Sequence, residues 1–229
     1  MGQLVTFQCP GCHRYWVLSR EELEPITVFR AVPEGAQAAD ARGLVYLPFW
    51  VVEIDGAGLR ARIEDAVKEL QSASQAVIRT GFEGTSPRRL PAASEVNPLA
   101  ARLEKLGTLN VYVPAFKSLN TYAYLKVGRL LTRIQPSFAL DRSDGAGRPV
   151  LCALRSQEAV PLADFIFFST LSGSIQDNGD FLEKIHLAPA RPPRLVEFPF
   201  KPRGASLVSV IGGFWISGRL VEGIESLVE

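Results

Sequence analysis

The sequence is poor in the residues on which enzymes and metal sites usually depend. Its 229 residues include two histidines, three cysteines and one methionine. Only His13 and His186 could serve as the histidine of a Ser-His-Asp or Cys-His catalytic arrangement. The GxSxG, HExxH and Walker A motifs do not occur either. This scarcity weighs against an enzyme, and no catalytic residue is predicted.

An excess of positive charge is also absent. There are 25 Lys and Arg residues against 24 Asp and Glu residues, a net charge of +1. Proteins that bind nucleic acid usually carry a clear positive excess, because phosphate contacts dominate their affinity. Two short basic clusters, Arg88-Arg89 and Arg191 with Arg194, lie in proline-containing stretches without interleaved aromatic residues. The composition therefore argues against nucleic acid as a partner.

Long hydrophobic runs are lacking as well. The most apolar stretch, residues 207–216, is about half the length needed to cross a bilayer. The first nine residues have neither the basic region nor the apolar run of a secretory signal. Cysteines without an export signal are expected in a reducing compartment, where they serve metal or redox chemistry. We therefore expect a soluble cytoplasmic protein with no membrane partner.

What is present is the composition of an ordinary globular protein. Hydrophobic residues make up 47% of the chain and charged residues 21%, so one large domain with a small appendage can form. Strand patterns occur at 26–32, 43–55, 109–116, 150–154, 195–198, 207–211 and 214–216, and helix patterns at 59–70, 99–106 and 119–134. Residues 162–171 fit a buried helix or a buried strand equally well. We predict an α+β fold with a mixed or antiparallel sheet and two or three packed helices.

A polar stretch at 33–42, rich in alanine and glycine, divides the chain. We predict an N-terminal cysteine-knuckle segment at 1–32 and an α+β body at 43–229. Within the knuckle segment, Ser19 followed by Glu22 matches a capping box, which predicts a short turn of helix.

The most specific motif is Cys9-Pro-Gly-Cys12. Two residues between cysteines allow both thiolates to reach one tetrahedral ion from a tight turn, and Pro-Gly suits that turn. The alternation of residues 3–18 predicts a β-hairpin whose turn carries both cysteines. This segment resembles one half of a zinc ribbon, over roughly the first twenty residues. The resemblance implies a zinc ion bound by Cys9 and Cys12.

A complete zinc ribbon needs a second pair of cysteines or histidines, and the chain has no second CxxC. Three explanations stay open: remote ligands (His13, Cys152 or His186), a pair from a second chain in a dimer, or a metal-free remnant. The spacing also matches a c-type haem attachment or a thioredoxin-like dithiol. Haem attachment needs export, and the sequence shows no export signal. A thioredoxin-like dithiol motif opens a helix, whereas residues 15–18 predict a strand.

A second motif, Gly56-Ala-Gly58-Leu-Arg-Ala, follows the strand pattern and precedes the first helix pattern. Glu83 ends the next apolar stretch, where an acid that binds ribose would lie. These residues resemble the dinucleotide-binding fingerprint over about thirty residues. The resemblance implies a dinucleotide held by Gly56, Gly58 and Glu83.

Three features count against the dinucleotide hypothesis. Glu53 and Asp55 lie in what would be a fully buried parallel strand. No repeated strand–helix–strand rhythm follows. Asp55-Gly56 also fits a hairpin turn.

Three apolar strand patterns run into a proline and then an aromatic residue, at 45–49, 111–116 and 196–200. Because proline cannot donate to a sheet ladder, we predict that the three strands end on one rim of a sheet. Each would then place its aromatic residue in the core. The alternative is an aromatic groove on that rim for a partner peptide.

The leading functional hypothesis is a non-enzymatic module that acts through protein–protein contact or self-association. Its basis is the scarcity of catalytic residues and a half-ribbon that a second chain would complete. The alternative, from another class, is a dinucleotide-binding protein.

Overall fold

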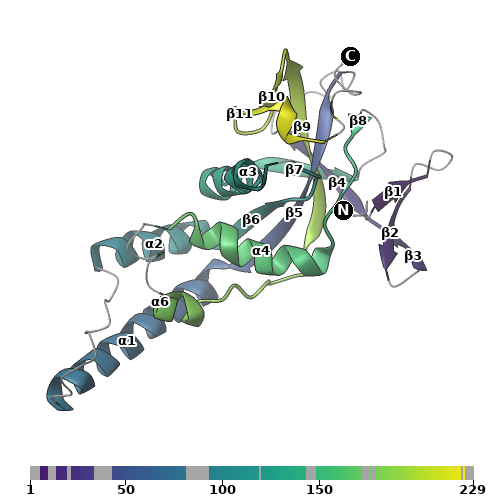
Figure 1. Ribbon diagram of the computed structural model, residues 1–229. Coiled ribbons are helices and arrows are strands. Elements are labelled where there is room, and N and C mark those ends of the chain that lie inside the picture. Colours follow the sequence, from purple (N-terminus) through teal and green to yellow (C-terminus); the bar gives the residue numbers. More distant parts are fainter. Residues whose placement is uncertain are drawn as a thin grey trace.

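The computed structural model describes residues 6–9, 14–19, 22–33, 43–80, 93–118, 120–142, 148–171, 176, 179–222 and 224. Within these ranges the chain forms a small sheet, a larger mixed sheet and five α-helices (Figure 1). The predicted α+β class is confirmed, although the described helices number five and not two or three.

The small sheet contains three antiparallel strands in chain order: β1 (Thr6–Gln8), β2 (Tyr15–Ser19) and β3 (Glu22–Ile26). The predicted hairpin is confirmed, since Phe7 of β1 pairs with Trp16 of β2. The helical turn predicted from Ser19 and Glu22 is wrong, because these two residues pair with each other across β2 and β3.

The larger sheet is built around one long strand. Its strands are β4 (Val28–Pro33), β5 (Val45–Asp55), β6 (Thr108–Pro114), β7 (Phe138–Arg142), β8 (Arg148–Pro149), β9 (Arg194–Arg203), β10 (Ser206–Ser209) and β11 (Trp215–Ser217). The order runs β11-β10-β9-β4-β7, and β5 pairs with β9, β6 and β8. Strand β5 is antiparallel to both β6 and β9, whereas β4 is parallel to β9. Strand β4 comes from the predicted segment 1–32, yet it pairs within the larger sheet.

The helices are α1 (Gly56–Thr80), α2 (Ala93–Leu106), α3 (Thr121–Ile134), α4 (Ser156–Phe168) and α6 (Gly179–Lys184), with a 3-10 turn η1 (Gly218–Leu220). The ambiguous segment 162–171 is therefore largely helical. The strand predicted at 150–154 is wrong, and only the two residues of β8 just before it pair with β5. Figure 1 shows α1 and α2 projecting together from the body. None of the described helices is both long and apolar enough to cross a membrane.

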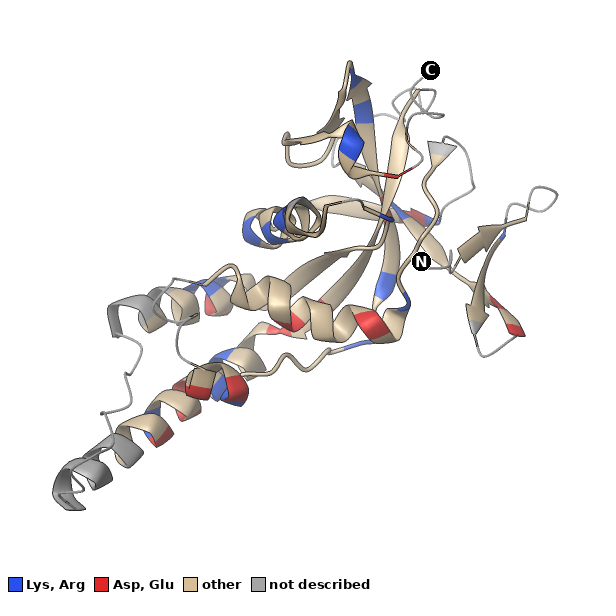
Figure 2. Cartoon of the chain, viewed as in Figure 1, with Lys and Arg blue, Asp and Glu red and all other residues tan. Residues whose placement is uncertain are grey.

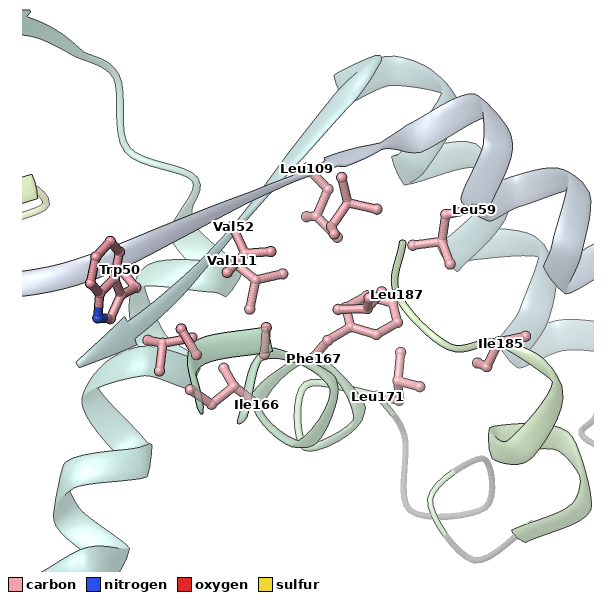
Figure 3. Close-up of a cluster of buried hydrophobic side chains, with 14 of the residues drawn as sticks. Trp50, Val52, Leu59, Leu109, Val111, Ile166, Phe167, Leu171, Ile185 and Leu187 are labelled. Carbon is pink, nitrogen blue, oxygen red and sulfur yellow. The ribbon is translucent and has the colours of Figure 1, made fainter. Parts of the chain in front are cut away.

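Alternate residues of β5 enter two separate hydrophobic clusters, one on each face of the sheet. On one face Trp50 and Val52 pack against α4, together with residues of β6, α1 and the segment after α6 (Figure 3). On the other face lie Phe49 and Val51. Because both faces are covered, residues 45–52 are buried without interruption, which explains their unbroken apolar run.

The second cluster is rich in aromatic rings. Phe198 lies at its centre and makes edge contacts with the rings of Phe49, Tyr112 and Phe138, with centroids 5.2, 5.7 and 5.1 Å away. Helix α3 contributes Val127 and Leu131 to the same cluster. This arrangement satisfies the preference of aromatic pairs for edge-to-face geometry.

The prediction that three prolines end their strands on one rim is wrong for two of them. Pro48 lies inside β5, between the residues that pair with β8 and those that pair with β6. Pro199 lies inside β9, between the residues that pair with β4 and those that pair with β10. Proline has no backbone N–H to donate. Each of these prolines therefore lies where one edge of its strand passes from one neighbouring strand to the next. Strand β5 pairs with both β6 and β9, and the aromatic side chains that follow the three prolines are buried in the core, as predicted.

Candidate functional site

The structure places one of the two predicted zinc ligands. Cys9 directly follows β1, and its N–H donates to the carbonyl of Arg14 at 2.9 Å, which closes the base of the hairpin turn. Its side chain is half-buried. Cys12 and His13 lie outside the described residues. Among the residues that are described, no group of three or more His, Cys, Asp or Glu side chains could hold one ion, so zinc stays a prediction.

Cys152, considered above as a remote ligand, lies beside β1 through its backbone. Its N–H donates to Thr6 Oγ1 at 2.9 Å, and the Thr6 N–H donates to its carbonyl at 3.3 Å. Its thiol points into the body and donates to the Leu154 carbonyl at 3.1 Å. Burial raises the pKa of Cys152 to about 12, so in this structure the group is a neutral thiol at neutral pH. The Cys152 side chain is buried in the first hydrophobic cluster.

The glycine loop connects β5 directly to α1, so Asp55-Gly56 does not form a hairpin turn. The Asp55 carboxylate accepts hydrogen bonds from the N–H groups of Ala57 and Gly58, at 3.1 and 3.0 Å. These are first-turn N–H groups of the kind that bind the pyrophosphate in a dinucleotide site. The strand before the loop, β5, is antiparallel to β6 and β9, whereas the fingerprint belongs to parallel sheets.

Both glycines have a packing role. A Cβ on Gly56 would lie 2.8 Å from the carbonyl oxygen of Gly107, and one on Gly58 would lie 2.7 Å from Asp55 Oδ2. The Gly56 N–H also donates to the Gly107 carbonyl at 2.9 Å. Glu83 lies outside the described residues. The described part of the loop is thus explained by helix capping and close backbone approach.

A buried carboxylate that sequence reasoning missed joins the small sheet to the body. Glu197 of β9 is 1% exposed. It accepts a hydrogen bond from the Tyr15 hydroxyl of β2 at 2.6 Å and one from Arg30 of β4 at 3.3 Å. The Arg30 guanidinium lies 4.0 Å from the ring centroid of Tyr46. The sequence signal for this site was a single Glu within the apolar run 195–200. Because a charge is buried only when it is paired, such a Glu indicates a buried partner.

The outer side of the C-terminal hairpin carries an exposed aromatic residue. Val208 of β10 pairs with Lys201 of β9 on one side and with Trp215 of β11 on the other. Trp215 is 71% exposed, and Val210 just after β10 is also exposed. We call these four residues the hairpin face. The strand residues between them, such as Ile216, point into the aromatic cluster, as the two-residue period of a strand requires.

The surroundings of the hairpin face are basic. Arg203 and Arg219 lie in the same stretch of sequence as Lys201, and Figure 2 shows blue Lys and Arg segments in this part of the larger sheet. The sequence has no Asp or Glu from Phe198 to Val221. Among the described strands, β11 pairs with β10 alone. The region therefore combines an exposed indole, local positive charge and one strand edge.

Comparison with known protein families, with curated proteins and with solved structures found no match to the chain. Function is therefore argued from the geometry of the described residues.

Proposed function

We propose that this protein is a non-enzymatic interaction module, and that the hairpin face binds an extended, acidic segment of a partner protein. The observation that carries the proposal is the exposure of Trp215 on a strand at the edge of the larger sheet. Tryptophan is the residue most enriched among those that dominate binding energy at protein interfaces. An exposed indole beside apolar side chains is costly to leave in water, and a partner would cover it.

The edge of β11 favours an extended partner. Such an edge presents backbone N–H and C=O groups to which another chain can add a strand. Main-chain hydrogen bonds would supply affinity, and Trp215 would pack on alternate side chains of the added strand.

The local charge favours an acidic partner. Lys201, Arg203 and Arg219 are not balanced by any carboxylate between Phe198 and Val221. A partner with Asp or Glu would gain attraction and associate faster at low salt. A second copy of the chain would bring the same three cations to the contact, so self-association through this face is disfavoured.

The test uses fluorescein-labelled peptides of about twelve residues that alternate Glu with Val, and matched peptides with Lys in place of Glu. We expect the acidic peptides to raise the fluorescence anisotropy when the full chain is added, and the basic ones not to. Trp215→Ala should weaken binding by about tenfold or more. Tyr122→Ala, which removes another strongly exposed aromatic residue, on α3, should leave binding unchanged.

Two results would overturn the proposal. One is equal binding of the acidic peptides by the native chain and by Trp215→Ala. The other is a dimer in light scattering that Trp215→Ala dissociates, which would make a second copy the occupant of the hairpin face.

A further inference from the structure

Helix α3, next to the C-terminal hairpin, is basic on its outer side. It contains Lys126, Arg129 and Arg133 and no Asp or Glu, and Figure 2 shows blue bands along it. The spacing of three and four residues places the three cations on one side of the helix, and all three are exposed. The buried residues Val127 and Leu131 lie on the opposite side. We call the three cations the α3 stripe.

The charge of the α3 stripe is not neutralised by any residue that the structure describes. None of the ion pairs between described residues includes a member of the stripe. The sequence has no Asp or Glu between Lys105 and Leu140, just as it has none between Phe198 and Val221. Two basic regions without carboxylates create a local positive potential that attracts an acidic ligand.

The two basic regions meet where the end of α3 lies beside the tip of the hairpin. A Cβ on Gly212, in the turn between β10 and β11, would lie 3.9 Å from Cδ1 of Ile134, the last residue of α3. Phe214 of the same turn belongs to the hydrophobic cluster that α3 enters, and Figure 1 shows this turn next to α3. Val210 of the hairpin face is 41% exposed and Ile134 is 42% exposed. A chain that passes the tip of the hairpin therefore reaches the end of α3 over exposed apolar side chains.

We propose that the acidic partner segment continues past the tip of the hairpin and lies along α3, where its carboxylates contact the α3 stripe. This inference rests on the proposed function, because the hairpin face anchors the segment. From Ile134 back to Lys126 the helix rises about 12 Å, a distance that about four residues of extended chain span. Alternate side chains of an extended segment lie about 7 Å apart. Successive cations of the stripe are about 4.5 and 6 Å apart along the helix axis, so alternate carboxylates can follow them.

Charge and hydrogen bonding favour a protein segment over a nucleic acid. The whole chain has a net charge of only +1, and exposed carboxylates such as Glu22, Glu24 and Asp65 repel a long polyanion. A short acidic segment meets only the basic regions. The edge of β11 also offers both N–H and C=O groups, which a peptide strand can pair. A phosphate backbone has acceptors alone and leaves the carbonyl groups unpaired.

The test extends the Glu–Val peptide of twelve residues by six residues that alternate Glu with Ser. The extension is placed at the N-terminus or at the C-terminus, because a strand can pair with β11 in either direction. Matched peptides carry Gln in place of Glu in the extension. Binding to the full chain is measured by fluorescence anisotropy at about 20 mM salt, where surface charges are weakly screened. One of the two acidic extensions should tighten binding at least about threefold over its Gln version.

Arg129→Glu is the decisive variant, because it reverses one charge of the stripe and also forms a helical pair with Arg133. It should abolish the gain from the extension while the unextended peptide still binds. Lys68→Glu, which makes the same charge reversal at an exposed position of α1, is the matched control and should keep the gain. Salt at about 0.5 M should reduce the gain in the native chain.

Three results would overturn the proposal. One is that neither extension tightens binding although the unextended peptide binds, which would leave the hairpin face intact as the proposed site. The second is that Arg129→Glu keeps the gain. The third is that labelled (dT)12 binds more tightly than the extended peptides and loses binding in Arg129→Glu, which would make single-stranded nucleic acid the occupant of the stripe. If the unextended peptide does not bind at all, the proposed function fails together with this inference.

Discussion

Gln135 completes the edge of β6 by pairing with Asn110 through both ends of its side-chain amide. Its Nε2 donates to the Asn110 carbonyl at 2.6 Å, and its Oε1 accepts from the Asn110 N–H at 3.0 Å. A neighbouring strand would make the same two hydrogen bonds. Gln135 follows α3 with a φ of 48°, in the left-handed region, and this conformation turns its side chain back onto the strand. Thr132 adds a third bond, since its Oγ1 accepts from the Tyr112 N–H at 3.1 Å.

The first prediction concerns this edge. Gln135→Leu should lower the free energy of unfolding by about 1–3 kcal/mol, because it leaves the Asn110 N–H and carbonyl without these partners. Gln157→Ala, an exposed change on α4, should stay within about 0.5 kcal/mol of the native value. Urea unfolding measures both. Equal stability of the two variants would show that the Gln135 bonds are not stabilising.

The second prediction concerns Gly128 of α3. A Cβ there would lie 2.6 Å from the Tyr112 carbonyl oxygen and 2.9 Å from Ile166 Cδ1. Alanine is favoured over glycine in helices by about 1 kcal/mol, yet we expect Gly128→Ala to destabilise the protein by about 1–3 kcal/mol through overpacking. Gly179→Ala, at the start of α6 with open space around it, is the control and should not destabilise. Thermal unfolding of both variants decides the point, and a higher melting temperature for Gly128→Ala would refute the close approach.

The third prediction concerns the attachment of the small sheet. Tyr15→Phe removes the hydroxyl that donates to the buried Glu197, which should cost about 1–3 kcal/mol. Amide hydrogen exchange should rise first in β1–β3, because this hydrogen bond links β2 to the body. Tyr122→Phe should change neither stability nor exchange. If exchange in β1–β3 stayed at the native level, the Tyr15–Glu197 bond would not hold the small sheet in place.

The fourth prediction concerns the Cys152 thiol. Unfolded cysteine ionises near pH 8.5, whereas burial raises the pKa of Cys152 to about 12 in the folded protein. As the pH rises above about 8.5, the unfolded state loses this proton first, so stability falls. The fall should be shallower in Cys152→Ala than in the native chain, when unfolding is followed at several pH values up to about 10. If the stability of both proteins fell equally with pH, the raised pKa of Cys152 would be contradicted.

The fifth prediction concerns zinc. We expect the purified, untagged protein to contain zinc bound by Cys9 and Cys12, and Cys9→Ser to lose it. Cys152→Ala should retain it, because that thiol is buried in the body. Elemental analysis, with the molecular mass from light scattering on the same sample, gives the stoichiometry. One zinc per two chains in a dimer would indicate a site shared between two Cys9–Cys12 pairs, and one per chain would indicate remote ligands. A monomer without metal and with free thiols would refute the zinc site.

The sequence by itself determined the local elements of this protein. The apolar pattern at 43–55 predicted a strand, and β5 spans Val45–Asp55. Amphipathic spacing predicted α1 and α3, and the alternation around Cys9 predicted the first hairpin. These features depend on hydrophobic periodicity and on turn residues. Both are encoded by residues that are neighbours in the sequence.

The tertiary structure alone decided which segments became partners. Ser19 and Glu22 carry the pattern of a helix cap but form strand pairs, because β3 pairs with β2. Pro48 lies inside a strand because β8 and β6 meet at that point on its flank. Glu197 is tolerated in the core because Tyr15 and Arg30, more than 160 residues away in the chain, hydrogen-bond to it. Such long-range contacts leave no local pattern in the sequence. The hydrogen bonds to Glu197 therefore form only in the folded protein.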